Sequence, residues 1–178
     1  MPVISSRRTN KFLRLAKTGD TPTQRGRMFE SLICYLFGKI PGVIITHRDQ
    51  LNIFLSEEID IALWNDKVAG ALDFLPNIIL IEAKNWLSPV GSVEVAWFDR
   101  KLTDRGLDFG ILVALNGITG NAEDRTAAHH IIAGCLRQKR RLVILTESDI
   151  INIRDTDELV LLIKRKLCEL AVTGSLSR

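Results

Sequence analysis

The sequence predicts an α/β fold in which one mixed β-sheet is covered by helices on both faces. Three observations support this class. Apolar residues recur every three or four positions in several long segments, short aliphatic runs separate these segments, and glycine or proline stands at many junctions. The elements follow in the order helix, three strands, helix, strand, helix, strand, helix. With 178 residues, the chain is long enough to build one compact core.

The first long helix is expected over residues 22–37. Thr21, Pro22 and Gln24 match the N-cap, the first helical position and the glutamine of a capping box. A Pro-Gly pair then ends the helix. Residues 5–20 either form a short basic helix or stay loose. Strands are expected in three aliphatic runs, over residues 43–48, 58–64 and 77–84.

The second half of the chain alternates helices with strands, and together with the three preceding strands this order implies a mixed sheet. Helices are expected in the amphipathic segments 91–106, 121–139 and 155–170. Strands are expected in the apolar runs 109–116 and 141–146.

The net charge of +3 is unevenly distributed. Residues 1–41 contain eight basic and two acidic side chains, so we divide the chain into a basic N-terminal segment (residues 1–20) and a folded domain (residues 21–178). A polyanionic partner and a solvated surface explain this basic charge equally well. If the partner is a nucleic acid, the side chains expected to contact it are Arg7, Arg8, Lys11, Arg25 and Arg27. A second basic cluster closes a helix, where cations complement the helix dipole; its members are Arg137, Lys139, Arg140 and Arg141.

Neither a membrane span nor a secretory signal is readable, because no apolar run approaches 18 residues and the N-terminus lacks an apolar core. We therefore expect a cytoplasmic protein that does not bind membranes. Its cysteines, Cys34, Cys135 and Cys168, are odd in number and far apart, which favours buried reduced thiols over disulfides or a zinc site.

The segment NIILIEAKNW, residues 77–86, places Glu82 and Lys84 directly after an aliphatic run. Successive side chains of a strand point to opposite faces, so these two charges project from the same face. In the strand over residues 58–64, Asp60 belongs to the polar face. If the two strands form an antiparallel hairpin, Asp60 lies opposite Glu82, with Cβ atoms about 4.5 to 5.5 Å apart.

Two carboxylates at this separation repel each other unless a cation lies between them. A divalent metal is expected, because Mg²⁺ binds one or two carboxylates and completes its shell with water and phosphate oxygens. Lys84 would then orient the attacking water and help to remove its proton, or stabilise charge on the phosphate. The alternative is a structural salt bridge between Glu82 and Lys84, which is what a bare Glu-x-Lys pattern usually represents.

Two further carboxylates are candidates. Glu30 lies in the first long helix, where its neighbours one turn away are mainly apolar, so it could hold a second metal or a metal-bound water. The alternative is an ordinary glutamate at the border of a helix. Asp73 also has a permissible spacing to Glu82, but Asp60 is favoured because Asp73 falls in a loop between glycine and proline.

The ordered segments RGRMFE, EEIDIAL, LIEAKNW and VGSVEVAWFDRKL resemble the PD-(D/E)XK nuclease superfamily. Within it, the chain resembles Mrr-like type IV restriction endonucleases and NERD-type nuclease domains over roughly residues 24–153. The resemblance implies a restriction-endonuclease-like fold. It implies Asp60 and Glu82 as metal ligands together with the carbonyl of Ala83, Lys84 as the catalytic lysine, and Glu30 as the helix carboxylate.

Two positions depart from the family pattern. Ile59 replaces the proline before the aspartate, and the helix after Lys84 lacks the glutamine found in many relatives, which leaves the roles of Trp97 and Lys101 open.

We therefore expect an endonuclease that uses Mg²⁺ or Mn²⁺ to hydrolyse phosphodiester bonds in DNA, in restriction, defence or repair. The alternative is a catalytically silent nucleic-acid-binding or assembly module that retains the nuclease fold. RNA is an alternative substrate. A homodimer and a separate targeting subunit are both compatible with this chain length.

Overall fold

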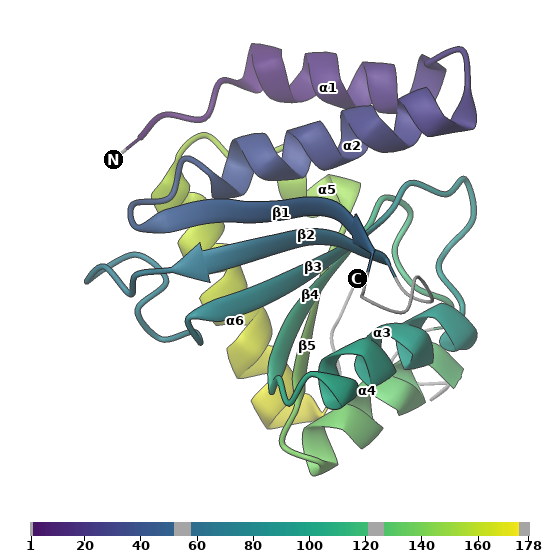
Figure 1. Ribbon diagram of the computed structural model, residues 1–178, viewed down its shortest axis with the longest axis vertical. Coiled ribbons are helices and arrows are strands. Elements are labelled where there is room, and N and C mark those ends of the chain that lie inside the picture. Colours follow the sequence, from purple (N-terminus) through teal and green to yellow (C-terminus); the bar gives the residue numbers. More distant parts are fainter. Residues whose placement is uncertain (1, 52–57, 121–126, 175–178) are drawn as a thin grey trace.

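The computed structural model describes residues 2–51, 58–120 and 127–174 and contains a five-stranded mixed sheet flanked by helices (Figure 1). This arrangement confirms the predicted α/β class. The strands are β1 (Val43–Leu51), β2 (Glu58–Asn65), β3 (Ile78–Lys84), β4 (Phe109–Ala114) and β5 (Arg141–Leu145). The helices are α1 (Ser6–Thr18), α2 (Pro22–Phe37), α3 (Ser92–Asp104), α4 (Ala127–Arg137), α5 (Glu147–Ile150) and α6 (Thr156–Thr173).

The strands follow one another across the sheet in chain order. The first three form an antiparallel meander, and β3, β4 and β5 are parallel. Helices α3 and α4 make the two crossovers between parallel strands, and they contact each other on one face of the sheet (Figure 1). The predicted element order is therefore confirmed, with two additions: residues 5–20 contain a full helix, and the short α5 was not predicted.

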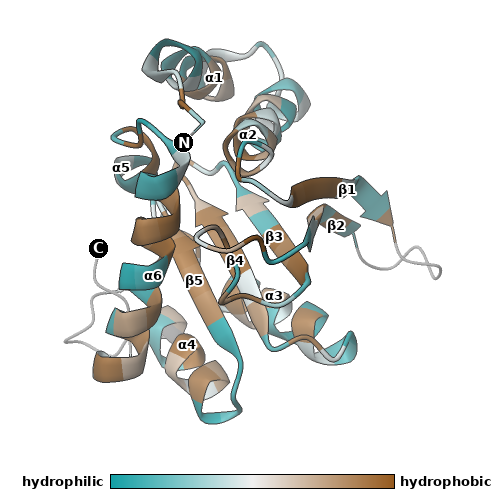
Figure 2. Ribbon diagram, turned by 90° about the vertical axis from the view of Figure 1, so that its left-hand side faces the viewer, coloured by the Kyte–Doolittle hydropathy of each residue, from teal (hydrophilic) through white to brown (hydrophobic). Residues whose placement is uncertain are grey.

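Two apolar cores lie on the two faces of the sheet. Alternate residues of β3 divide between them: Ile79 and Ile81 pack into the core shared with α1, α2 and α6, whereas Leu80 packs into the core shared with α3 and α4. Strands β4 and β5 are buried on both sides, and their apolar character is visible along most of their length in Figure 2. Because the faces alternate, Glu82 shares the face of Leu80.

Helix α1 is attached to the domain by its apolar side. Leu13 and Ala16 are buried in the core under α1 and α2, and Ser5 caps the helix by accepting a hydrogen bond from the N–H of Arg8. Thr21 caps α2 as predicted. The side chain of Gln24 accepts from the N–H of Asp20 at 2.9 Å, one residue earlier than in the predicted capping box.

One smaller expectation needs correction. The cysteines are free as predicted, but Cys168 is exposed and Cys34 is half-buried, so only Cys135 fits the expected buried thiol. His129 is also buried. The start of the helix predicted over residues 121–139 lies outside the described residues. Within the part of the chain that the structure describes, no helix has the length and apolarity needed to cross a membrane.

Candidate active site

The hairpin of β2 and β3 brings Asp60 to the strand that carries Glu82. Ile61 pairs with Ile81 and Ala62 with Leu80, which is the predicted register. One step beyond these pairs, Oδ2 of Asp60 accepts a hydrogen bond from the backbone N–H of Ala83 at 2.7 Å. This bond directs the carboxylate of Asp60 toward the end of β3.

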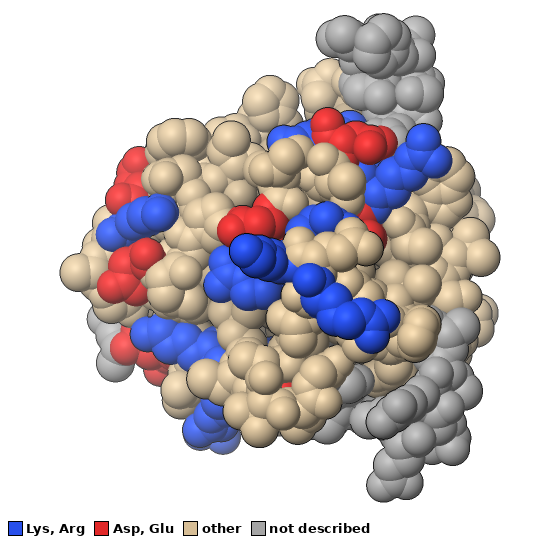
Figure 3. All heavy atoms as spheres, turned by 90° about the horizontal axis from the view of Figure 1, so that it is seen from below, with Lys and Arg blue, Asp and Glu red and all other residues tan. Residues whose placement is uncertain are grey.

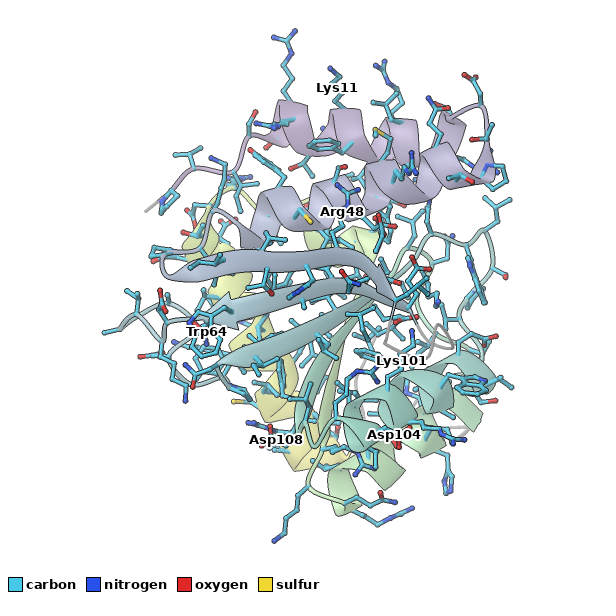
Figure 4. The ribbon with its side chains drawn as sticks, viewed as in Figure 1. Lys11, Arg48, Trp64, Lys101, Asp104 and Asp108 are labelled. Carbon is cyan, nitrogen blue, oxygen red and sulfur yellow. The ribbon has the colours of Figure 1, made fainter. Side chains whose placement is uncertain are left out.

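Glu82 is buried and lies between two ammonium groups. Its Oε1 is 2.8 Å from Nζ of Lys84, and its Oε2 is 2.7 Å from Nζ of Lys101 on α3. Lys101 also donates to the carbonyl oxygen of Glu58 at 2.8 Å, so one side chain connects α3 with both β2 and β3. Figure 4 shows Lys101 where α3 approaches these strands. The buried glutamate is therefore compensated by charges from two separate elements.

The electrostatics of this group follow from burial and proximity. Burial, followed by the negative charge of Glu82, raises the pKa of Asp60 to about 6, although the N–H of Ala83 and the charges of Lys84 and Lys101 oppose the shift. Burial lowers the pKa of Lys84, but the charge and hydrogen bond of Glu82 outweigh it, so this pKa lies above its ordinary value. Lys84 is thus a stable cation beside two carboxylates.

The donor set fits a hard divalent cation. Asp60 and Glu82 are close enough for one charge to raise the pKa of the other group, and a cation between them would relieve that repulsion. Among the described residues, no group of three or more His, Cys, Asp or Glu side chains is arranged to hold a metal. A site built on these two carboxylates must therefore use backbone, water or substrate oxygens as well, as Mg²⁺ sites commonly do.

Glu30 belongs to a different cluster, between α2 and β1. Its Oε2 accepts from Nε of Arg48 at 3.1 Å, and the same guanidinium donates to the carbonyl of Arg27 at 2.7 Å and to Ser31 at 3.1 Å. Burial, followed by a hydrogen bond with Asp49, raises the pKa of Glu30 to about 7. The groups that shift the pKa of Glu30 differ from those that shift the pKa of Asp60. The catalytic role of Glu30 stays a prediction.

Asp73, the alternative to Asp60, lies in the connection between β2 and β3. Its carboxylate accepts from the N–H of Gly70 at 3.3 Å, which makes it part of a turn at the other end of the hairpin. Of the two candidates, the structure brings Asp60 to the strand end occupied by Glu82.

The residues predicted to contact nucleic acid differ in their exposure and in the contacts that they make within the protein. Arg7 and Lys11 are exposed on α1, where Lys11 points away from the sheet (Figure 4). The guanidinium of Arg8 lies 4.5 Å from the ring centre of Tyr35, and Arg25 donates to the carbonyl of Gly19 at 2.9 Å. Arg27 is exposed on α2. Arg8 and Arg25 therefore also hold the packing of α1 and α2.

The second basic cluster is partly neutralised by neighbouring acids. Nε of Arg140 is 2.7 Å from Oδ1 of Asp99, and Nη2 of Arg141 is 3.9 Å from Oδ2 of Asp108. Figure 3 shows basic side chains interspersed with acidic ones when the molecule is seen from below. These pairs agree with the interpretation of this cluster as a solvated helix end.

Sequence reasoning missed the part that α3 plays at this site. Its buried stripe is Val95, Phe98 and Leu102, and the sequence left open the role of Lys101, which lies next to this stripe. One signal was present: Glu94, Trp97 and Lys101 recur at three- and four-residue spacing and so share one side of the helix directly after the Glu-x-Lys pattern.

A mixed sheet in which two neighbouring strands bring two acidic residues and a lysine together is characteristic of nuclease domains of the PD-(D/E)XK class. The family model described as restriction endonuclease, Mrr_cat, matches residues 23–137, more than half of the 178-residue chain. The chain therefore belongs to this restriction endonuclease family, which confirms the resemblance to Mrr-like nucleases. A comparison with curated proteins found no match.

Proposed function

We propose that this chain is a metal-dependent endonuclease that hydrolyses phosphodiester bonds in DNA at the end of β3. The family supports a nuclease domain that acts on DNA. The observation that carries the proposal is the convergence of Asp60, Glu82 and Lys84, because two carboxylates beside a fixed ammonium suit the positioning of a phosphate and a water.

Mg²⁺ or Mn²⁺ would be held by the carboxylates of Asp60 and Glu82 and by the carbonyl of Ala83. When bound, such an ion supplies a Lewis acid that lowers the pKa of water and polarises the phosphate. The hydrogen bond from the N–H of Ala83 fixes the orientation of Asp60 before any ligand arrives. The ammonium of Lys84 orients the attacking water and stabilises the charge that develops on the phosphate oxygens in an in-line displacement.

Lys101 acts as a positioning residue. It holds Oε2 of Glu82 at 2.7 Å and the carbonyl of Glu58 at 2.8 Å, so it fixes the rotamer of Glu82 and the separation of β2 from α3. Such supporting contacts commonly change activity by about 10- to 100-fold when they are removed.

The exposed basic residues of α1 are proposed to contact phosphates of the substrate. Because α1 contributes Leu13 and Ala16 to the core, substitution tests this better than deletion. The double variant Arg7→Gln/Lys11→Gln is expected to reduce the slope of log affinity against log salt by about 0.9 for each lost duplex contact. Arg165→Gln, on the exposed side of α6, is the matched control. An unchanged slope in the double variant would assign these residues to another partner.

The direct test of the proposed function is cleavage of plasmid, single-stranded DNA and RNA by the purified chain. Cleavage is expected with Mg²⁺ and not with EDTA. Asp60→Asn and Glu82→Gln should be inactive, and circular dichroism should show that both variants stay folded. Glu58→Gln, which keeps the backbone carbonyl that Lys101 contacts, should retain activity. If the wild-type chain cleaves none of these substrates, the proposal fails and a silent binding module takes its place.

A further inference from the structure

Two exposed tryptophans border the proposed reaction centre. Trp86 follows Lys84 by two residues, is 41% exposed, and has its ring centre 5.8 Å from Nζ of Lys84. Trp97 on α3 is 53% exposed. Large aromatic side chains gain considerable free energy from burial, so two indoles exposed beside the same charged group call for an explanation.

Trp97 is placed beside the centre by its neighbours on α3. One turn before it, Glu94 raises the pKa of Lys84 through its charge. One turn after it, Lys101 contacts Glu82 at 2.7 Å. Residues three and four positions apart share one side of a helix, so Trp97 lies between two contacts with the centre.

The backbone around both indoles is held firmly. The carbonyl of Trp86 accepts a hydrogen bond from the side-chain amide of Asn116, and Asn85 donates to the carbonyl of Ala16 at 2.7 Å. Helix α3 is anchored by its buried side. The backbone of both residues is therefore held in place while the rings are exposed, which lowers the entropic cost of binding a flat ligand.

Each ring also lies close to a cation. Lys84 is near the ring of Trp86, and the guanidinium carbon of Arg100 lies 5.7 Å from the ring centre of Trp97. Proteins that bind single-stranded nucleic acid combine aromatic faces, on which bases stack, with cations that follow the phosphates. The same two chemical groups, an aromatic ring and a cation, recur here at both tryptophans that border the carboxylates.

We propose that Trp86 and Trp97 stack on unpaired bases on the two sides of the scissile phosphate. The faces of bases within a duplex are covered by their neighbours, so the preferred substrate is single-stranded or locally unpaired DNA. This inference rests on the proposed function, because it places the bases around a phosphate at Asp60, Glu82 and Lys84.

Trp64 provides a matched control. It is 40% exposed, and its indole N–H donates to Asp66 at 2.8 Å. It lies at the other end of the strands from Lys101 (Figure 4). The chain has three tryptophans, so the two candidates and this control account for all of them.

The test measures the affinity of the full chain in EDTA for an oligo-dT strand and for a hairpin duplex of mixed sequence. Stacking on one base contributes about 1 to 3 kcal/mol, so Trp86→Ala and Trp97→Ala should each weaken oligo-dT binding by roughly 5- to 150-fold. Trp86→Phe and Trp97→Phe should recover part of this loss, because phenylalanine still offers a ring. Trp64→Ala should bind like wild type. Duplex affinity should change by less than about twofold in every variant.

Fluorescence gives a second readout. In Trp64→Phe, the emission of the two remaining indoles should be quenched by oligo-dT and much less by the duplex. Equal quenching by both ligands, or unchanged oligo-dT affinity in both alanine variants, would overturn the inference.

A cleavage assay distinguishes failure of the stacking inference from failure of the proposed function. If the tryptophan variants bind oligo-dT like wild type while Asp60→Asn abolishes cleavage, the inference is wrong and the nuclease assignment stands. If the wild-type chain cleaves nothing but its tryptophans are needed for oligo-dT binding, the stacking sites stand and the nuclease assignment is wrong.

Discussion

Two carboxylate clusters differ in what surrounds them. The first, Asp60 with Glu82, faces α3, and the second, Glu30 with Asp49, lies between α2 and β1. Burial raises a carboxyl pKa in both, to about 6 for Asp60 and to about 7 for Glu30. A raised pKa therefore does not by itself distinguish a reaction centre from a structural cluster.

The two clusters differ in the cations that contact their carboxylates. In the first cluster, two lysine ammonium groups, from β3 and α3, contact Glu82. One of them, Lys84, lies at the strand end beside an exposed indole. In the second, the guanidinium of Arg48 also donates to the carbonyl of Arg27 and to Ser31. Its hydrogen bonds are used to join α2 to β1. Under the proposed function, the first cluster binds a ligand and the second contributes to packing.

Among the variants that keep both carboxylates of the proposed metal site, the largest effect is expected from Lys84→Ala. It removes a positioned cation but no metal ligand, so turnover should fall by about 10² to 10⁴ while DNA binding stays close to wild type and Mg²⁺ binding is not weakened. Single-turnover cleavage and binding measured on the same preparation check this. Lys164→Ala, an exposed lysine of α6, is the control. Cleavage at the wild-type rate by Lys84→Ala would remove the difference drawn between the two clusters.

A smaller effect is expected from Lys101→Met, which preserves the length and apolar stem of the side chain. Turnover should fall by about 10- to 100-fold, because Glu82 loses the contact that fixes its rotamer. The Mg²⁺ concentration for half-maximal activity should fall as well, since a competing positive charge has been removed. If Lys101 contributes to stability alone, Lys101→Met would lower the thermal midpoint and leave this Mg²⁺ requirement unchanged.

Glu30→Gln should have the smallest effect on catalysis, with a loss of turnover below about tenfold and unchanged Mg²⁺ affinity. Its main effect should be on the pH dependence of stability. The folded state raises the pKa of Glu30 from 4.5 to about 7, so its contribution to stability is complete below about pH 4.5 and is lost as the pH rises to about 7.

Glutamine cannot release that proton, so the unfolding free energy of Glu30→Gln should fall less between pH 4.5 and 7 than that of wild type. The difference should be on the order of 1 to 2 kcal/mol, because coupling to Asp49 and solvent screening reduce the full value. Urea titrations at several pH values measure it. A loss of turnover as large as that of Lys84→Ala would instead place Glu30 at the reaction centre.

Much of the fold was predictable because local signals agreed with the tertiary structure. The alternation in β2 and β3 fixed the pairing of Ile61 with Ile81, since a slip by one residue would expose the apolar face. The N-cap at Thr21 set the start of α2. From that register, the approach of Asp60 to the strand end of Glu82 followed directly.

What could not be predicted depends on contacts between elements distant in sequence. Lys101 looks solvated in its own helix, and only the packing of α3 against the sheet brings it to Glu82. Likewise, a register shift in β1 between Ile45 and His47 precedes Arg48, whose salt bridge to Glu30 carries no sequence signal.

The most direct test of the central claim is Mn²⁺ binding, followed by electron paramagnetic resonance, to wild type, Asp60→Asn and Asp73→Asn. Asp60→Asn should weaken binding by about tenfold or more, because it removes one of two adjacent charges that the ion would neutralise. Asp73→Asn should bind like wild type, because Asp73 lies in the turn that contains Gly70. If Asp60→Asn binds Mn²⁺ as wild type does and Asp73→Asn does not, the assignment of the metal to the end of β3 is contradicted.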